Sequence, residues 1–298
     1  MSARRGLRTF GFYGDLEVPG AASAGPDLLL NLATYQERWS VYADSLSYLQ
    51  EIQRDRAQLG LRGRLGGGMK GVLWLGVSSA HPSATLKSDG KDRNLPATAL
   101  LPAAKQVNFL DIEVRLLRDR RDRQRSWQKG DWTGFALRLA EPDHGPFAWS
   151  AELDTRCYMP ILRTRAAALR LRSAFAAPGS PYFSRFVTGG AGSLRGFPAG
   201  SLSGPLGTRA LWEAGAEWRQ PLLGADQRWP LVLGTLFLDV GDHLRPTGRW
   251  HGASADVGFG ALFRLPWLRL LNVEVGYPLT EDPTEGPVAV QISLGRSF

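Results

Sequence analysis

The side chain best suited to a specific chemical role lies in a stretch that cannot form regular secondary structure. Residues 187–197 read Val-Thr-Gly-Gly-Ala-Gly-Ser-Leu-Arg-Gly-Phe, with four glycines within eight residues, a density that disfavours both helix and strand. A long irregular segment inside an ordered domain is usually functional or disordered. The guanidinium of Arg195 is a permanent cation that binds carboxylates through paired hydrogen bonds. We therefore expect Arg195 to stand at the tip of a loop that folds back onto a charge of the flanking strands.

The segments on either side of this loop supply such charges. Apolar side chains alternate with charged or small ones over residues 169–175 upstream and 212–219 downstream. This period of two predicts strands that have one apolar and one charged face. The charged face of the downstream strand carries Glu213, Glu217 and Arg219. We expect these charges to line an interior rather than to catalyse a reaction.

No catalytic constellation stands out elsewhere in the chain. Neither a Gly-x-Ser-x-Gly elbow nor a His-Glu-x-x-His helix is present, and residues 190–192 begin like a dinucleotide fingerprint but lack its βαβ context. Glu152 and Asp154 share one strand face, where a network with arginines is expected rather than a general acid and base. The sequence therefore predicts no catalytic residue, no cofactor and no enzymatic activity. All four histidines fall in predicted connections: His81, His144, His243 and His251.

The number of cysteines and the distribution of charge argue against further classes of protein. The single cysteine, Cys157, rules out an internal disulfide framework and a cysteine-based zinc site, so no metal is expected. A formal net charge of +8 is compatible with nucleic acid or anionic lipid as a partner. The arginines, however, mostly occupy alternate strand positions beside carboxylates instead of forming one patch. Nucleic-acid binding is therefore not expected.

Composition favours a membrane barrel. The 298 residues include 35 Gly and 19 Pro, which suits a fold with many turns, and the mean hydropathy is −0.20. No run approaches 18 apolar residues, which excludes a transmembrane helix. A strand of a transmembrane barrel needs only about 9–11 residues and alternates polar with apolar. The ten tryptophans suit the aromatic girdles of such a barrel.

Alternation continues along most of the chain from residue 58 onward, where eleven strands are visible. Bacterial single-chain barrels have even strand numbers, so a twelfth strand is expected from the N-terminal segment. The predicted fold is all-β: a transmembrane antiparallel β-barrel of about 12 strands (range 11–14) over residues 57–298. The eleven strands lie near 58–65, 69–79, 110–116, 135–139, 149–157, 169–175, 207–221, 229–241, 255–265, 269–279 and 287–298.

The N-terminal segment, residues 1–56, is the least barrel-like. Residues 8–18 are compatible with a strand. Over 27–55, apolar residues recur at alternating spacings of four and three after Gly25-Pro26-Asp27, a pattern that predicts an amphipathic helix. Such a helix would plug the lumen or lie on the membrane surface. The alternative is a hairpin that turns near Asp44-Ser45. The recurring residues are Leu28, Leu32, Tyr35, Trp39, Tyr42, Leu46 and Leu49.

Connection lengths suggest which end of the barrel faces the periplasm. If the chain ends in the periplasm, four of the five connections on that side are short, as is typical beneath longer extracellular loops. The exception is residues 119–129, which are rich in arginine and lysine. This connection is either a solvated turn or a contact for lipid headgroups or an acidic partner.

The loop motif resembles that of a known family. Gly-Gly-x-x-Ser-Leu-Arg-Gly-Phe, at 189–197, is similar to the barrel-loop motif of the BamA/TamA/TpsB surface-antigen superfamily of outer-membrane proteins. In that family the loop folds into the lumen, and its arginine meets an acidic residue of a Phe-x-Asp-x-Gly strand. Residues 215–221, 275–279 and Phe298 also fit, so the resemblance covers roughly 166–298. The loop motif comprises Gly189, Gly190, Ser193, Leu194, Arg195, Gly196 and Phe197, and the partner strand supplies Phe237, Asp239 and Gly241.

The resemblance implies a setting and partners. It implies that Arg195 pairs with Asp239 inside the lumen as a structural or gating pair, and that the terminal strand ending in Phe298 is read by the barrel assembly machinery. It also implies a place in the bacterial outer membrane among its lipids, with a protein or lipid as possible substrate. On the last strand, the face expected to meet lipid carries Val288, Ile292, Leu294 and Phe298.

The resemblance also implies a function, with one departure. Family members insert or translocate proteins, usually with periplasmic POTRA domains, which residues 1–56 do not resemble. We therefore predict a barrel without POTRA domains that acts in protein insertion, translocation or bilayer remodelling. The alternatives are the barrel portion of a larger enzyme-fused protein, such as a patatin-like one, and a passive pore. The basic start Met1–Gly6 is not followed by an apolar region, so no signal peptide is visible.

Overall fold

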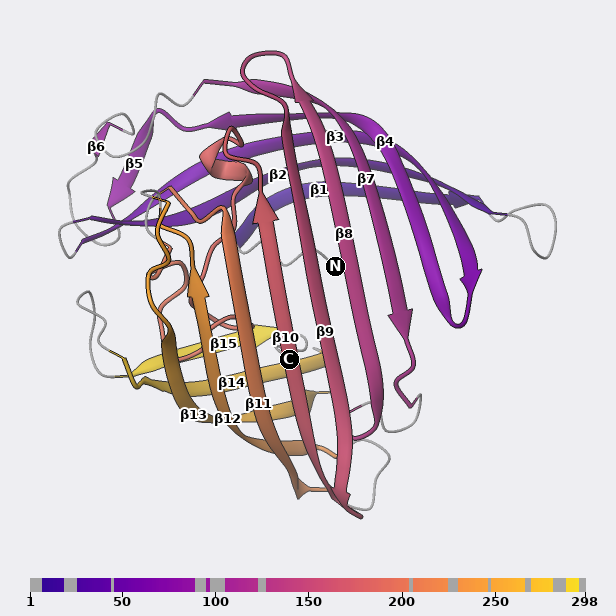
Figure 1. The fold of residues 1–298 in the computed structure, drawn as a ribbon, viewed down its shortest axis with the longest axis vertical. Coiled ribbons are helices and arrows are strands. Elements are labelled where there is room, and N and C mark those ends of the chain that lie inside the picture. The colour runs from indigo at the N-terminus through magenta and orange to yellow at the C-terminus, as the bar shows by residue number, and fades with distance from the viewer. Residues whose placement is uncertain are drawn as a thin grey trace.

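The chain forms one large antiparallel sheet in the computed structural model (Figure 1). Thirteen main strands follow one another in sequence order, and β5 and β6 lie off this path. Among the described residues no helix is long and apolar enough to cross a membrane. The structure describes residues 7–18, 26–43, 46–88, 95–96, 105–122, 127–203, 206–224, 230–245, 248–265, 269–280 and 288–294. The predicted all-β antiparallel fold is confirmed.

The element bounds follow the predicted alternation closely from residue 58 onward. The main strands are β1 (Leu7–Val18), β2 (Asp27–Ala43), β3 (Leu46–Gly66), β4 (Met69–Pro82), β7 (Val107–Asp119), β8 (Gly130–Pro142), β9 (Ala148–Leu162), β10 (Arg165–Ala176), β11 (Ala210–Leu223), β12 (Val232–His243), β13 (Ser254–Leu265), β14 (Arg269–Pro278) and β15 (Ala289–Leu294). The short elements are β5 (Thr85–Ser88), β6 (Leu95–Pro96) and the 3-10 turn η2 (Tyr182–Ser184).

The N-terminal helix prediction is wrong. Residues 27–43 and 46–66 are the paired strands β2 and β3, which is the hairpin alternative, although its turn at 44–45 lies outside the described residues. Along β2, Leu28 and Leu32 are exposed on one face, whereas Tyr35 is buried on the other. The apparent helical stripe therefore divides between the two faces of a strand.

The same region changes the strand count. The eleven strands predicted from residue 58 onward are present, but the N-terminal segment contributes two strands, β1 and β2, instead of one. The described sheet thus has thirteen main strands, within the predicted range and one more than twelve. β3 runs without interruption through residues 56 and 57, where the sequence had suggested a domain boundary.

Burial alternates in the sense opposite to that of a soluble protein. In β10 the outward Leu169 and Leu171 are 45% and 47% exposed, whereas the inward Arg170 and Arg172 are buried. On β12, Asp239 is likewise buried on the inner side. An apolar outer surface around a charged interior is the arrangement of a transmembrane barrel, whose outside meets hydrocarbon.

The last strand follows this rule where it is described. Val288, immediately before β15, is 52% exposed, and Val290 and Ile292 on β15 are 64% and 70% exposed. The side chain of Leu294 and the whole of Phe298 lie outside the described part of the chain, so their contact with lipid remains a prediction.

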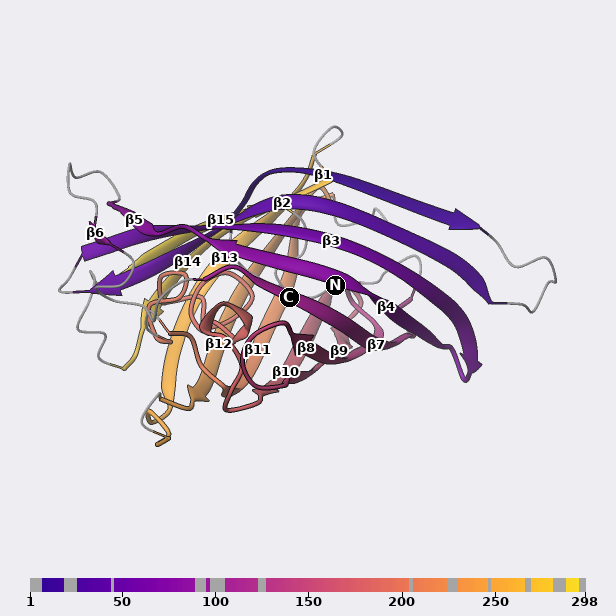
Figure 2. The same ribbon diagram turned by 90° about the horizontal axis from the view of Figure 1, so that it is seen from above.

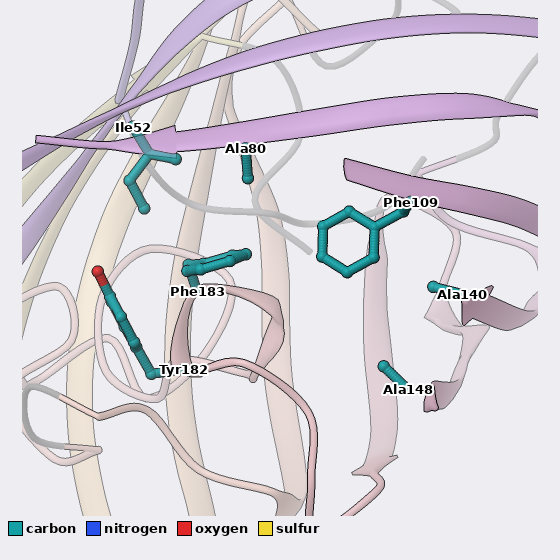
Figure 3. Packing of buried hydrophobic residues seen from close by; sticks show 7 residues of the cluster. All are labelled: Ile52, Ala80, Phe109, Ala140, Ala148, Tyr182 and Phe183. Carbon is teal, nitrogen blue, oxygen red and sulfur yellow. The ribbon is translucent and has the colours of Figure 1, made fainter. Parts of the chain in front are cut away.

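The sheet curves around the long connection between β10 and β11, residues 177–209, which we call the inner loop (described except for 204–205). Seen from above, this loop lies between the β1–β4 side of the sheet and the β11–β13 side (Figure 2). Its first part packs against β3, β4 and β7: Phe183 contacts Phe109 of β7 edge-on, with ring centroids 6.5 Å apart. Figure 3 shows Tyr182 and Phe183 directed towards Ile52, Ala80 and Phe109.

Polar contacts also hold Tyr182 and Phe183 of the inner loop against β3. The amide of Gln50 donates to the Tyr182 hydroxyl at 2.7 Å, and Arg54 Nη2 donates to the Phe183 carbonyl at 2.7 Å. The guanidinium carbon of Arg54 also lies 5.2 Å from the centre of the Phe183 ring. The inner loop is therefore attached to β3 before it reaches the glycine-rich motif.

Candidate functional site

The motif part of the inner loop is a compact chain of turns. Gly190 N donates to the Leu194 carbonyl, and Ser193 N donates to the Gly190 carbonyl, both at 3.0 Å. Gly189 and Gly190 have φ of 93° and 97°, values that L side chains rarely adopt. These turns bring Leu194, Arg195 and Phe197 to the inner wall of the sheet, where each is at most 1% exposed.

Arg195 is held by carboxylates from three strands. Its Nε and Nη2 donate to the two oxygens of Asp239 on β12, at 2.7 and 2.9 Å. Its Nη1 donates to Glu274 on β14 at 2.8 Å and lies 3.8 Å from Glu217 on β11. The paired geometry with Asp239 is the strongest form of an arginine–carboxylate contact. The structure thus brings together Arg195 and Asp239, the pair implied by the motif, and adds Glu274.

The surroundings keep Arg195 charged. Burial alone would lower the pKa of Arg195, but Asp239, Glu217 and Glu274 outweigh burial and raise this pKa above its ordinary value. The Phe237 ring lies beneath the guanidinium, with its centre 3.7 Å from Cζ, which adds a cation–π contact. Phe237 of the partner strand therefore contacts the loop arginine directly.

A second set of bonds fixes the loop backbone before Arg195. Ser193 Oγ accepts from Gly189 N at 3.0 Å and donates to Glu213. Glu213 also accepts from Arg172 Nη1 at 3.1 Å, and Arg170 Nη1 donates to the carbonyl oxygen of the loop at Gly192. The predicted interior charge Glu213 thus binds both the loop and β10.

Glu217 and Arg219, the other predicted interior charges, bind each other. Arg219 Nη2 donates to Glu217 at 3.1 Å, and Arg219 Nη1 donates to the Trp127 carbonyl at 3.2 Å. Arg219 therefore joins β11 to the connection that precedes β8, and only Glu217 of this pair approaches Arg195.

The loop approaches β13 and β14 through glycines. A Cβ at Gly276 would lie 2.6 Å from Gly196 Cα, and one at Gly196 would lie 2.4 Å from the Asp256 Cβ; both are too close for a side chain. Gly241 of the partner strand similarly leaves room for Leu194, since a Cβ there would lie 3.0 Å from Leu194 Cδ1. The glycines of the motif and of β14 thus permit direct contact between backbones.

Gln291 on β15 completes the attachment. Its side-chain amide donates to the carbonyl of Arg195 at 2.7 Å and to that of Phe197 at 3.1 Å. The inner loop is therefore bound to β11, β12, β14 and β15 as well as to β3.

One buried carboxylate in this site has no hydrogen-bond partner. Asp256 on β13 is fully buried, and it pairs in register with Asp239. Neither of its oxygens has a hydrogen-bond partner within the described residues. We refer to Arg195, Glu217, Asp239, Asp256 and Glu274 as the Arg195 site.

Sequence reasoning missed Glu274, Asp256 and Gln291 as members of this site, and it singled out residues 275–279 without assigning Gly276 to the site. Each lies at an inward or close-packed position of an alternating strand, but only the pairing of strands places them beside the loop. Phe298, the predicted assembly signal, lies outside the described residues. No group of His, Cys, Asp and Glu in the described part of the chain has a metal-binding arrangement. The contacts of the site hold the inner loop against the strands.

A curved antiparallel sheet with an apolar outside, a charged inside and a loop fixed within it defines a transmembrane β-barrel protein with an internal loop. The Omp85 superfamily domain matches residues 75–298. The chain belongs to the Omp85 superfamily and is a bacterial outer-membrane protein whose fold is similar to that of BamA.

Solved structures support this fold. BamA from Haemophilus ducreyi lacking POTRA domains 1–3 is similar, with a TM-score of 0.72 at 15% identity over 95% of this chain and 61% of that one. CdiB from Acinetobacter baumannii gives 0.61 at 13% identity, over 95% and 49%. CdiB from Escherichia coli gives 0.56 at 14% identity, over 95% and 51%. This chain thus spans about half to three fifths of the proteins it matches. No curated protein matches it.

Proposed function

We propose that this protein inserts polypeptides into the outer membrane or translocates them across it, and that the inner loop closes the barrel between events. The observation that carries this proposal is the attachment of the loop to both sides of the interior. Tyr182 and Phe183 bind β3, and Arg195 binds carboxylates of β12 and β14.

This attachment argues against a passive pore. A passive pore needs a permanently open path, whereas here the buried residues 193–197 and the ion pairs around them fill part of the interior. Opening would require the Arg195 site to break, which a small solute cannot drive but a binding polypeptide can, through its differential affinity for the open state. Membership of the Omp85 superfamily supports a polypeptide substrate, because the family that the loop motif resembles inserts or translocates proteins.

Reconstitution into vesicles tests the proposal. We expect low conductance for the wild type and higher conductance for Arg195→Ala. We also expect an outer-membrane barrel protein unfolded in urea to fold faster in vesicles that contain the wild type than in empty vesicles. A control variant, Arg185→Ala, changes an arginine of the same loop that donates to the backbone carbonyls of Ser180 and Leu206; it should conduct like the wild type. Steady high conductance of the wild type without faster substrate folding would identify a passive pore instead.

A further inference from the structure

Three neighbouring turns form a continuous rim at the end of the sheet where connections are short. The β7–β8 connection, residues 120–129, lies between the β3–β4 and β9–β10 turns; its residues 123–126 are outside the described part of the chain. Arg120 Nη2 donates to the Gly67 carbonyl at 3.2 Å. The Gln128 amide donates to the carbonyls of Leu162 and Arg163, both at 3.1 Å. The three turns are therefore fixed relative to one another.

This rim contains a hollow of about 430 Å³, which we call the rim hollow. Its apolar side consists of Pro160, Ile161 and Leu162, and its polar side of Asp122, Gln128, Lys129 and Arg163. Ile161 and Leu162 are 48% and 52% exposed. They continue the apolar outer surface of β9, on which Met159 is 40% exposed. The rim hollow thus opens at the edge of the surface that meets hydrocarbon.

The polar side of the rim hollow carries unbalanced positive charge. Lys129 and Arg163 are exposed, and neither forms an ion pair with any described residue. Asp122 is the one carboxylate among the residues that line the hollow. The other carboxylates of the rim are already engaged by its own arginines: Asp119 binds Arg121 at 2.6 Å, and Asp131 lies 3.6 Å from Arg118. The exposed Arg64, Lys70 and Arg120 add further positive charge nearby.

We propose that the rim hollow binds the phosphate of an anionic phospholipid. Lys129 and Arg163 contact the phosphate, because a guanidinium pairs with phosphate oxygens through two hydrogen bonds and an ammonium adds a compact charge. The acyl chains lie against Ile161 and Leu162. Cations directly beside exposed apolar side chains mark the depth of lipid headgroups. An acidic protein segment would use the cations but would not need the apolar side, so the lipid is the better fit.

The test measures lipid selectivity of the full chain in phosphatidylcholine vesicles that contain trace spin-labelled phosphatidylglycerol or phosphatidylcholine. The fraction of immobilised label gives the preference for each lipid. We expect the wild type to prefer phosphatidylglycerol. In Lys129→Gln/Arg163→Gln this preference should fall about fivefold for each cation removed, because one cation near an anionic surface contributes about that factor. Lys129→Arg/Arg163→Lys keeps both charges and should retain most of it.

A matched control removes two exposed cations at the opposite end of the sheet, Lys105→Gln/Arg249→Gln, and should behave like the wild type. Heat-modifiable migration establishes that each variant is folded. Wild-type preference in the rim variant would overturn the proposal. Binding of inorganic phosphate without enrichment of phosphatidylglycerol would show a free-phosphate site and also overturn it. Binding of polyglutamate at the rim without lipid preference would assign it to an acidic protein partner. None of these readouts depends on a polypeptide substrate.

Discussion

Alanine substitutions at Arg195 and Asp239 should have unequal effects that do not add. The side chains of Arg195, Asp239 and Glu274 are 1%, 5% and 2% exposed, so the pair is shielded from water. Removing one partner of such a pair costs about 3–5 kcal/mol, because the other is left buried and uncompensated. Asp239→Ala should fall near the lower value, because Arg195 keeps Glu274 at 2.8 Å. Arg195→Ala should fall near the upper value, because two carboxylates lose their cation.

The assay is a double-mutant cycle on the protein folded in detergent. The free energy of unfolding is measured from denaturant titrations of heat-modifiable migration, and loop release from protease access to residues 177–203. We expect the double variant to lose about 1–3 kcal/mol less than the sum of the single losses. Arg185→Ala, in the same loop, serves as the control for loss of an arginine.

Two results would refute the reasoning. Additivity within about 0.5 kcal/mol would mean that Arg195 and Asp239 do not interact. Losses below about 1 kcal/mol for both single variants would mean that water screens the pair, as it does exposed ion pairs.

Asp256→Asn should leave the inner loop docked at least as firmly as in the wild type, because an uncharged amide of similar shape cannot repel Asp239, which it faces in register; a lower denaturation midpoint would contradict this. Gly276→Ala should cost about 1–3 kcal/mol and expose the loop to protease, because a Cβ would lie 2.6 Å from the loop backbone. Gly63→Ala, whose Cβ would meet nothing within 4 Å, is its control. Deleting Phe298 should reduce the amount of protein in isolated outer membranes while total synthesis is unchanged; equal amounts would argue against an assembly signal there.

Much of the fold could be predicted because residues that face the inside and the outside of a membrane barrel alternate along each strand, and the two sets differ in polarity. The alternation of Arg170 and Arg172 with Leu169 and Leu171 identified β10 from local sequence alone. The N-terminal region misled because both faces of β2 carry large apolar residues. With apolar residues on both faces, spacings of four and three arise in a strand, and only pairing with β1 and β3 decides the structure.

Only those residues of the Arg195 site that belong to a sequence motif could be predicted. Arg195 and Asp239 belong to recognisable motifs. Glu274 and Asp256 reach the same point because β12, β13 and β14 pair in one particular register, which no local pattern reveals. A one-residue shift of β14 would turn Glu274 to the lipid side. The additional carboxylates are therefore a property of the assembled sheet.

The attachment of the loop to late strands has a consequence for the order of folding. The loop carbonyl of Arg195 is bound by Gln291, 96 residues further along the chain, and its guanidinium by Glu274, 79 residues further. Contacts between such distant residues form slowly, because closing a long loop costs chain entropy before any bond repays it. The inner loop has no complete binding surface until β11, β12, β14 and β15 have paired. Burial of Arg195 should therefore be one of the last events of folding, and it would report that the C-terminal half of the sheet is complete.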